Sequence, residues 1–368
     1  MPSLSLTRRV RATPFTDRVA AAGVKAYTVY NHMLLPSLFT TLEEDYHHLK
    51  SAVQIWDVSC ERQVEISGPD AARLVQMMTP RDLSKQQIGQ CTYSPTVDAE
   101  GRILNDPVTV KLDEDRFWVS VADSDVILFA KGLAIGAGLD VTVTEPDIHP
   151  LAIQGPKAFD LAAAVFGDQV RSIRFFRYGT VSFGGRTHLI ARSGYSVQRG
   201  FEVYLNGADL GHAMWDALME AGRPMDVRAG GPNLIERIEG GLLSYGSDMT
   251  TENSPYEAGL GKYCAPDRVS CVGSAALLRE AKEGPDRIIR SIAIDGPPID
   301  NPHIPLPLMA DGQRVGAVTS AIWSPDYKIN VALGMVESSH WDPGTTLTLQ
   351  APGGPRTATL RDRPFHMD

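Results

Sequence analysis

The sequence predicts an α+β protein in which two related α+β units precede a small all-β unit. Its 368 residues exceed what one small hydrophobic core accommodates. The segment 66–71 (ISGPDA) recurs as 153–158 (IQGPKA), and both match a strand end, a Gly-Pro corner and a helix start. The stretch 296–308 contains five prolines, and the short apolar runs after it are typical of a small β barrel or sandwich.

Local patterns support each unit. Residues 63–66 alternate as in a strand, and after the Gly-Pro corner apolar residues recur at helical spacing. Two hairpins are predicted. The first joins 107–112 to 117–121 across an acidic turn, and the second joins 188–191 to 200–205 across Ser193-Gly194.

Composition excludes several classes of protein. The net charge is −9 and no block of basic residues occurs, so an extended nucleic-acid partner is not expected. No apolar run is long enough for a membrane span, and the first eleven residues lack a signal-peptide core. The four cysteines form no Cys-x-x-Cys pair. We expect reduced thiols in a cytoplasmic protein, and we allow for a homodimer.

The common nucleotide, hydrolase and metal motifs are missing. Gly136-Ala137-Gly138 lacks the third glycine of a dinucleotide-binding loop, and neither a Walker A sequence nor a Gly-x-Ser-x-Gly elbow occurs. No stretch has the ligand spacing of a zinc or calcium site. No bound metal is therefore expected.

Polar residues within apolar strands are the remaining candidates for function. Asn105-Asp106 precedes a strand, where turn capping is the simplest explanation. Glu202 interrupts an apolar strand, and simple alternation would place it on a wet face that it shares with Tyr204. A carboxylate beside a phenol would also suit a flat heterocycle rich in N–H donors, so both interpretations stay open.

The order of these segments along nearly the whole chain resembles the glycine-cleavage aminomethyltransferase family. The resemblance rests on segments in all thirds of the chain: 56–59 (WDVS), 66–71 (ISGPDA), 101–106 (GRILND), 153–156 (IQGP), 193–195 (SGY), 200–204 (GFEVY), 237–239 (RIE), 255–260 (PYEAGL), 316–320 (GAVTS) and 332–334 (ALG). The resemblance implies a ring of three domains around a central folate channel. We expect α+β domains over 1–150 and 151–285 and a β barrel over 286–368.

The resemblance also implies tetrahydrofolate as co-substrate and methyl acceptor. Glu202 would accept hydrogen bonds from the ring N–H and amino group of the pterin. The other candidates for the folate site are Tyr195, Tyr93, Val108 and Ser120. The candidates beside the reacting centre are Asp106, Asn105 and Tyr204.

Two stretches, 26–36 and 53–58, resemble the branch of the family that demethylates a small sulfonium compound. Aminomethyltransferases carry a catalytic acid where this chain has Asn105, which argues against glycine cleavage. For a sulfonium donor, Tyr30 and Trp118 would form an aromatic wall, and Arg81 would bind the carboxylate. Two alternatives stay open: another folate-dependent transferase of this fold, and a folate-binding protein without chemistry.

Overall fold

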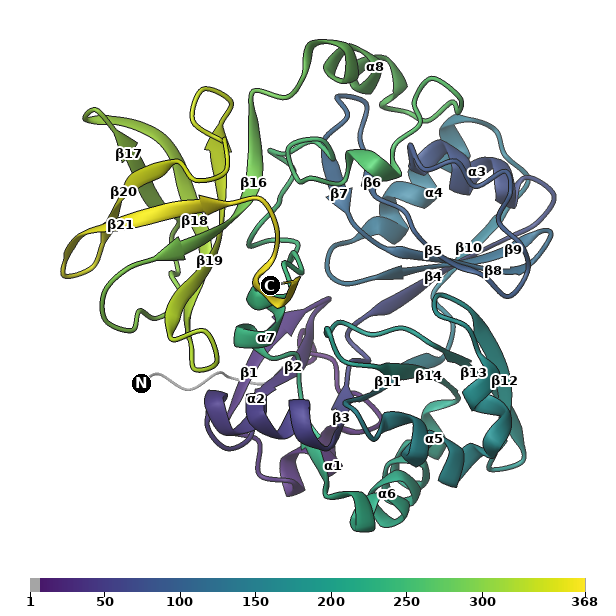
Figure 1. The fold of residues 1–368 in the computed structure, drawn as a ribbon. Coiled ribbons are helices and arrows are strands. Elements are labelled where there is room, and N and C mark those ends of the chain that lie inside the picture. The colour runs from purple at the N-terminus through teal and green to yellow at the C-terminus, as the bar shows by residue number, and fades with distance from the viewer. Residues whose placement is uncertain (1–6, 368) are drawn as a thin grey trace. The chain divides into compact units, whose positions relative to one another are not determined.

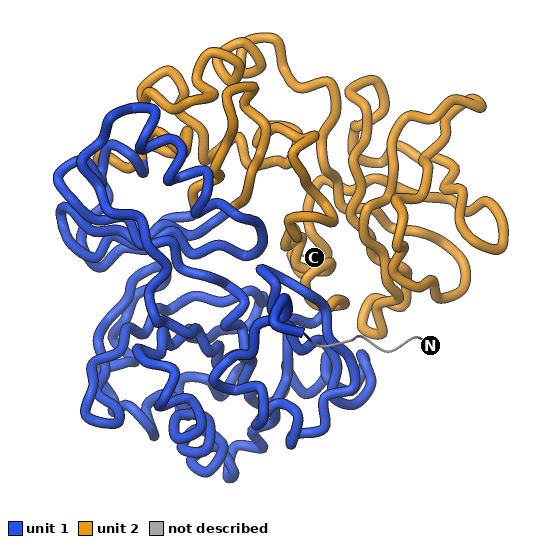
Figure 2. The backbone as a smooth tube through the Cα atoms, turned by 180° about the vertical axis from the view of Figure 1, so that it is seen from behind, with its two compact units in different colours: residues 1–75, 85–93, 107–233 blue, residues 76–84, 94–106, 234–368 orange. Residues whose placement is uncertain are grey.

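The structure, a computed structural model, describes residues 7–367, which form the two compact units coloured in Figure 2. Unit 1 comprises the residues up to Val75 together with 85–93 and 107–233. Unit 2 comprises 76–84, 94–106 and the chain from Leu234 onward. The chain therefore passes between the units more than once.

A six-stranded sheet in unit 1 carries two helices on one face (Figure 1). Its strands, in spatial order, are β12 (Tyr178–Phe183), β13 (Arg186–Ala191), β14 (Gly200–Asn206), β11 (Ile148–Gln154), β3 (Val53–Asp57) and β15 (Val227–Gly230). Only β15 runs parallel to its neighbour. The helices are α5 (Ala158–Phe166) and α6 (Gly211–Gly222). Apolar side chains from alternate strand positions and from both helices form one buried core.

The second sheet of unit 1 has five antiparallel strands (Figure 1). In spatial order they are β10 (Thr142–Thr144), β4 (Arg62–Ser67), β9 (Arg116–Val121), β8 (Val108–Asp113) and β5 (Cys91–Tyr93). Helix α3 (Ala71–Met78) follows β4, and α4 (Val126–Gly136) follows β9. The predicted hairpin of β8 and β9 is confirmed, as is that of β13 and β14 in the other sheet.

The repeated Gly-Pro segment forms the same corner in both sheets. Strand β4 ends one residue before Gly68 and β11 ends one residue before Gly155, and helices α3 and α5 follow. Both glycines have φ of +126°. A Cβ at Gly68 would lie 2.7 Å from the Asp140 carbonyl oxygen, and one at Gly155 would lie 2.5 Å from that of Ala52. The predicted internal repeat is thus a repeated strand–corner–helix unit that excludes a side chain at its turn.

We expect Gly155→Ala to lower the free energy of unfolding by about 1–3 kcal/mol. Its Cβ would be strained by the positive φ and would also clash with the backbone of Ala52. Urea-induced unfolding measures the change. The matched control is Gly132→Ala on α4, where the Cβ would meet nothing within 4 Å and alanine favours the helix. Equal effects of the two substitutions would contradict this account.

The first predicted domain boundary, at residue 150, falls inside β11. Strand β3, from the N-terminal part of the chain, pairs with β11 over four residues from Leu151 to Gln154. All five residues of β3 are buried, as expected for an inner strand. The six-stranded sheet therefore combines residues from both of the α+β domains expected from the sequence.

The N-terminal part of unit 1 contributes four further elements, α1 (Thr16–Ala21), β1 (Ala26–Tyr30), β2 (Met33–Leu38) and α2 (Leu42–Ser51). Strands β1 and β2 form a two-stranded sheet of their own. Thr41 caps the N-terminus of α2: its hydroxyl accepts the Glu44 backbone N–H at 3.1 Å and donates to the Glu44 carboxylate at 3.0 Å. Three short 3₁₀ turns complete the unit: η1 (Asp168–Ser172), η2 (Ala208–Leu210) and η3 (Arg223–Met225).

Unit 2 contains the predicted C-terminal β barrel, which is confirmed (Figure 1). Its closed order is β16 (Arg287–Ile294), β19 (Ile329–Glu337), β18 (Gln313–Ser324), β17 (Leu306–Ala310), β20 (Thr346–Ala351) and β21 (Gly354–Arg361). The remaining elements are β6 (Thr96–Val97), β7 (Ile103–Asn105), α7 (Leu234–Glu239), η4 (Gly261–Tyr263), α8 (Ser274–Glu283) and η5 (Phe365–Met367). No helix within residues 7–367 is long and apolar enough to cross a bilayer.

Candidate active site

The face of the six-stranded sheet opposite α5 and α6 carries Glu202 and Tyr204. On β14 the flanking residues Phe201, Val203 and Leu205 belong to the core beneath the helices. The period of two along a strand therefore turns Glu202 and Tyr204 to the other face, as predicted. Tyr204 is only 4% exposed and Glu202 9%. Alternation along the strand would by itself leave this face exposed to solvent, but in the structure the face is buried.

The five-stranded sheet provides this cover with a row of polar and aromatic side chains. In register across β4, β9, β8 and β5 lie Gln63, Ser120, Val108 and Tyr93. Two residues away on each strand, and therefore on the same face of the sheet, a second row contains Glu65, Trp118, Val110 and Cys91. The Trp118 and Tyr204 rings meet with centroids 5.7 Å apart, and both belong to one buried cluster. Unit 1 thus brings six of the predicted residues onto two facing sheets: Glu202, Tyr204, Ser120, Trp118, Val108 and Tyr93.

Glu202 is a buried carboxylate that accepts a hydrogen bond from a neutral side chain. The Ser193 hydroxyl donates a short hydrogen bond to Glu202 Oε2. Burial raises the pKa of Glu202, and the hydrogen bond from Ser193 opposes that rise. No arginine or lysine contributes to this balance. The carboxylate can therefore accept hydrogen bonds from the N–H groups of a ligand in a site that excludes water.

Tyr204 stays a neutral phenol beside this carboxylate. Burial and then the charge of Glu202 raise the pKa of Tyr204 well above its usual value, while a hydrogen bond with Ser120 opposes them. The Gln63 side-chain amide in turn donates to the Ser120 hydroxyl at 3.0 Å. Tyr204 is therefore suited to hydrogen bonding and ring packing rather than to proton abstraction.

We expect Glu202→Gln to stabilise the protein near neutral pH. Because burial raises the folded-state pKa of Glu202, the folded protein holds this proton more tightly than the unfolded chain, whose pKa is about 4.3. Stability is therefore lost as pH rises from the unfolded pKa through the folded pKa. The advantage of glutamine should grow over that range, by about 1.4 kcal/mol per unit of pKa shift. Unfolding titrations at several pH values measure it, and a constant difference would contradict the assignment.

Trp118 is held in place by Glu65, its neighbour on strand β4. Its indole N–H donates to Glu65 Oε2 at 2.8 Å, and the Arg116 guanidinium pairs with the same oxygen at 2.6 Å. With an exposure of 4%, Trp118 serves as packing for Tyr204. Tyr30, the other predicted aromatic wall residue, packs against a different buried cluster that contains Trp56.

The remaining predicted residues lie elsewhere. Tyr195 is half-buried in the loop between β13 and β14, close in sequence to Ser193. Asn105 and Asp106 belong to unit 2, where Asn105 is fully buried on β7 and pairs with Thr96. Arg81 also belongs to unit 2, and its guanidinium lies over the Tyr263 ring at 5.2 Å. The roles of these four residues remain predictions.

Sequence reasoning missed Ser193, Gln63, Glu65 and Cys91. Ser193 was assigned to a turn, although its position beside Tyr195 marks the loop that leads into β14. Burial and then the charge of Glu202 raise the pKa of the Cys91 thiol to about 12, so Cys91 remains protonated. The described cysteines are all free, as expected. Among residues 7–367, no cluster of histidine, cysteine or carboxylate side chains could hold a metal ion.

Comparison with known proteins agrees with this architecture. The family described as "GCVT N-terminal domain" matches residues 15–268, and "Glycine cleavage T-protein C-terminal barrel domain" matches residues 291–366. The chain is 54% identical to dimethylsulfoniopropionate demethylase DmdA of Ruegeria pomeroyi over 98% of this chain and 99% of that protein. It is 30% identical to a probable aminomethyltransferase of Halobacterium salinarum over 97% and 99% of the two chains.

The fold also occurs among solved structures. The crystal structure of glycine cleavage system aminomethyltransferase T from Bartonella henselae matches with a TM-score of 0.87 over 97% of this chain and 98% of that one. The two sequences are 24% identical, so this likeness concerns the fold.

Proposed function

Because the chain belongs to the glycine-cleavage T-protein family, we propose that it is a tetrahydrofolate-dependent demethylase of dimethylsulfoniopropionate. The products would be 5-methyltetrahydrofolate and 3-methylmercaptopropionate. The observation that carries the substrate assignment is the similarity to the Ruegeria demethylase, which extends along nearly the whole chain. The less similar aminomethyltransferases support the use of folate, although their names indicate a different reaction.

The side chains of unit 1 fit a flat heterocycle rich in N–H donors. Glu202 supplies buried carboxylate oxygens. Gln63 Oε1 is a second buried acceptor, and it has no hydrogen-bond partner within residues 7–367. Gln63 is linked through Ser120 to Tyr204 on the facing sheet. We therefore assign Glu202 and Gln63 as acceptors for the pterin of tetrahydrofolate, with Tyr204 and Trp118 as the packing surface.

The proposed reaction needs positioning more than proton transfer. The methyl group would pass from the sulfonium sulfur to N5 of tetrahydrofolate as the carbon–sulfur bond breaks with its electron pair going to sulfur. The thioether that leaves is neutral and needs no proton, and the methylated nitrogen would release its proton to solvent. Demethylation of a sulfonium is therefore compatible with Asn105 at the position where aminomethyltransferases carry a catalytic acid. The residues of the site would hold the reacting atoms in line and exclude water. Tyr93 and Val108 would wall the site, and Asp106 would support its geometry.

Binding of the methyl donor is assigned to aromatic and basic side chains. Tyr30 and Trp118 would face the sulfonium by cation–π attraction. Because Trp118 is buried against Tyr204, Tyr30 is the more accessible of the two. Arg81 would pair with the donor's carboxylate. The free thiols among the described residues support a cytoplasmic location as part of the same proposal.

The test is an anaerobic assay of the purified protein with tetrahydrofolate and dimethylsulfoniopropionate. We expect 5-methyltetrahydrofolate and 3-methylmercaptopropionate to appear in equal amounts. Folate binding without either product would overturn the sulfonium substrate, and a panel of other methyl and aminomethyl donors would then distinguish another transferase from a protein that only binds folate. The absence of folate binding would overturn the whole proposal.

A further inference from the structure

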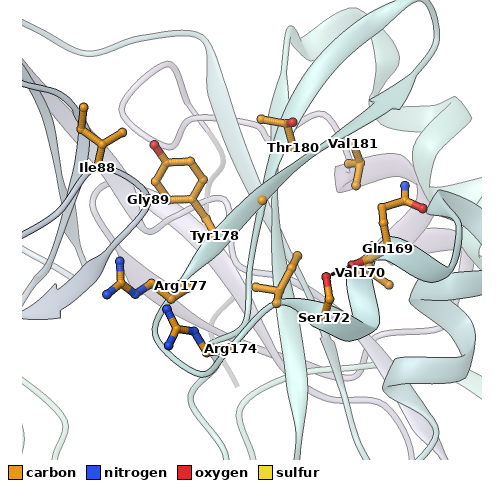
Figure 3. A pocket seen from close by; sticks show the side chains of 12 residues that line it. Ile88, Gly89, Gln169, Val170, Ser172, Arg174, Arg177, Tyr178, Thr180 and Val181 are labelled. Carbon is orange, nitrogen blue, oxygen red and sulfur yellow. Dashed lines mark hydrogen bonds between the residues drawn. The ribbon is translucent and has the colours of Figure 1, made fainter.

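We propose that a cleft beside strand β12 binds a small dianion, a phosphate ester or a dicarboxylate, through Arg174 and Arg177. The cleft has a volume of about 430 Å³, within the range of small-molecule sites. It is lined by η1, by β12 and by Ile88-Gly89 (Figure 3). None of its residues belongs to the candidate active site, and the inference does not depend on the proposed function.

The position of β12 explains why a cleft forms here. This strand lies at the edge of the six-stranded sheet, and β13 is its only neighbour in that sheet. The segment before β5 hydrogen-bonds to the first residue of β12: the Tyr178 backbone N–H donates to the Gly89 carbonyl at 3.1 Å. Beyond that point Gly179, Thr180 and Val181 line the cleft along the strand edge.

A tight turn brings the two arginines together. The Arg177 backbone N–H donates to the Arg174 carbonyl at 3.0 Å, so the arginines occupy the first and last positions of a four-residue turn. Within it Phe176 has φ of +56°, a conformation that aromatic residues rarely adopt. The turn is fixed on both sides: the Cys91 N–H donates to the Phe176 carbonyl, and the Phe176 N–H donates to Arg192, each at 3.0 Å. Figure 3 shows both guanidinium groups extending to the same side of the cleft.

Neither guanidinium is neutralised within residues 7–367. Arg177 Nη2 donates to the neutral amide oxygen of Gln87 at 3.0 Å, which orients the group without cancelling its charge. The neighbouring Arg171, by contrast, pairs with Asp160 at 2.8 Å and with Asp168 at 3.2 Å. Two adjacent uncompensated cations in a chain of net charge −9 form a local positive site.

The chemistry of the cleft favours a compact ligand with two negative charges. Two guanidinium groups can each give paired N–H donors to phosphate or carboxylate oxygens, and a dianion removes their mutual repulsion. The Thr180 side chain on the cleft wall adds a hydroxyl group, whereas the Ser172 hydroxyl already donates to the Gln169 carbonyl at 2.7 Å. Phosphate esters and dicarboxylates share this chemistry.

The test is calorimetric titration of the full-length protein with inorganic pyrophosphate and, separately, with succinate. We expect saturable binding of at least one probe. The double variant Arg174→Ala/Arg177→Ala should weaken that binding by at least about tenfold. Pyrophosphate binding alone would identify a phosphate ligand, and succinate binding alone would identify a dicarboxylate. Circular dichroism checks that the variant is folded.

A matched control distinguishes binding at this cleft from a general effect of positive charge on the protein surface. The double variant Arg186→Ala/Arg223→Ala removes the same charge from exposed arginines that already pair with Asp209 and Glu220. It should bind the probe as tightly as the parent protein does. Equal weakening in both double variants, or no saturable binding of either probe up to about 10 mM, overturns the proposal.

Discussion

Replacing Glu202 by alanine is expected to lower kcat/KM for tetrahydrofolate by at least about a hundredfold. Hydrogen bonds to a buried charged group contribute about 1.5–3 kcal/mol each, and the proposed pterin contact uses two. Glu202 is buried and accepts a hydrogen bond from the neutral Ser193 hydroxyl, so its carboxylate oxygens are the buried acceptors that alanine would remove. Initial rates at varied folate concentration measure the effect.

Two further variants make this result interpretable. Glu202→Gln keeps the shape of the side chain and, as argued above, should be at least as stable as the parent protein. Its loss of activity would therefore reflect lost recognition rather than lost folding. Glu220→Ala removes an exposed carboxylate paired with Arg223 and should leave the rates unchanged. If Glu202→Gln keeps full activity, the proposed pterin contact is wrong.

In the barrel-containing unit, we expect Asp248→Ala to lower the free energy of unfolding by about 3–5 kcal/mol. The Asp248 side chain is completely buried and pairs with Arg237 Nη1 at 2.8 Å. It also accepts the hydroxyls of Thr319 and Ser320, each at 2.7 Å, and the Ser244 backbone N–H at 3.0 Å. Removing the carboxylate would take away the charge that pairs with the buried Arg237 guanidinium and the acceptor for these three hydrogen bonds.

Urea-induced unfolding measures this loss, with Ser320→Ala as a milder variant. Ser320 both accepts from Arg237 and donates to Asp248, so its removal should cost about 1.5–3 kcal/mol while leaving the ion pair intact. Ser320→Ala also keeps the test usable if Asp248→Ala does not fold. Effects below about 1 kcal/mol for both variants, as is typical of exposed pairs, would show that this network does not hold the segment around Asp248 to β18.

Features with a local cause could be predicted from the sequence. The Gly68 and Gly155 corners, the hairpins of β8–β9 and β13–β14, and the placement of Glu202 and Tyr204 on one face follow from turn chemistry and from strand periodicity. Family membership rests on the order of many short segments along the chain.

The surroundings of the site depended on long-range pairing. Strand periodicity places Glu202 on a face but cannot show that the sheet carrying Trp118 and Gln63 covers it, which is what buries the carboxylate and raises its pKa. Gln63 and Cys91 gained a role only because strands distant in sequence bring them to the same interface. A local turn pairs Arg174 with Arg177, whereas the open strand edge beside them arises from the order of strands in the sheet. A carboxylate, an amide or a guanidinium acquires its chemistry from burial and neighbouring charge, and both are properties of the folded chain.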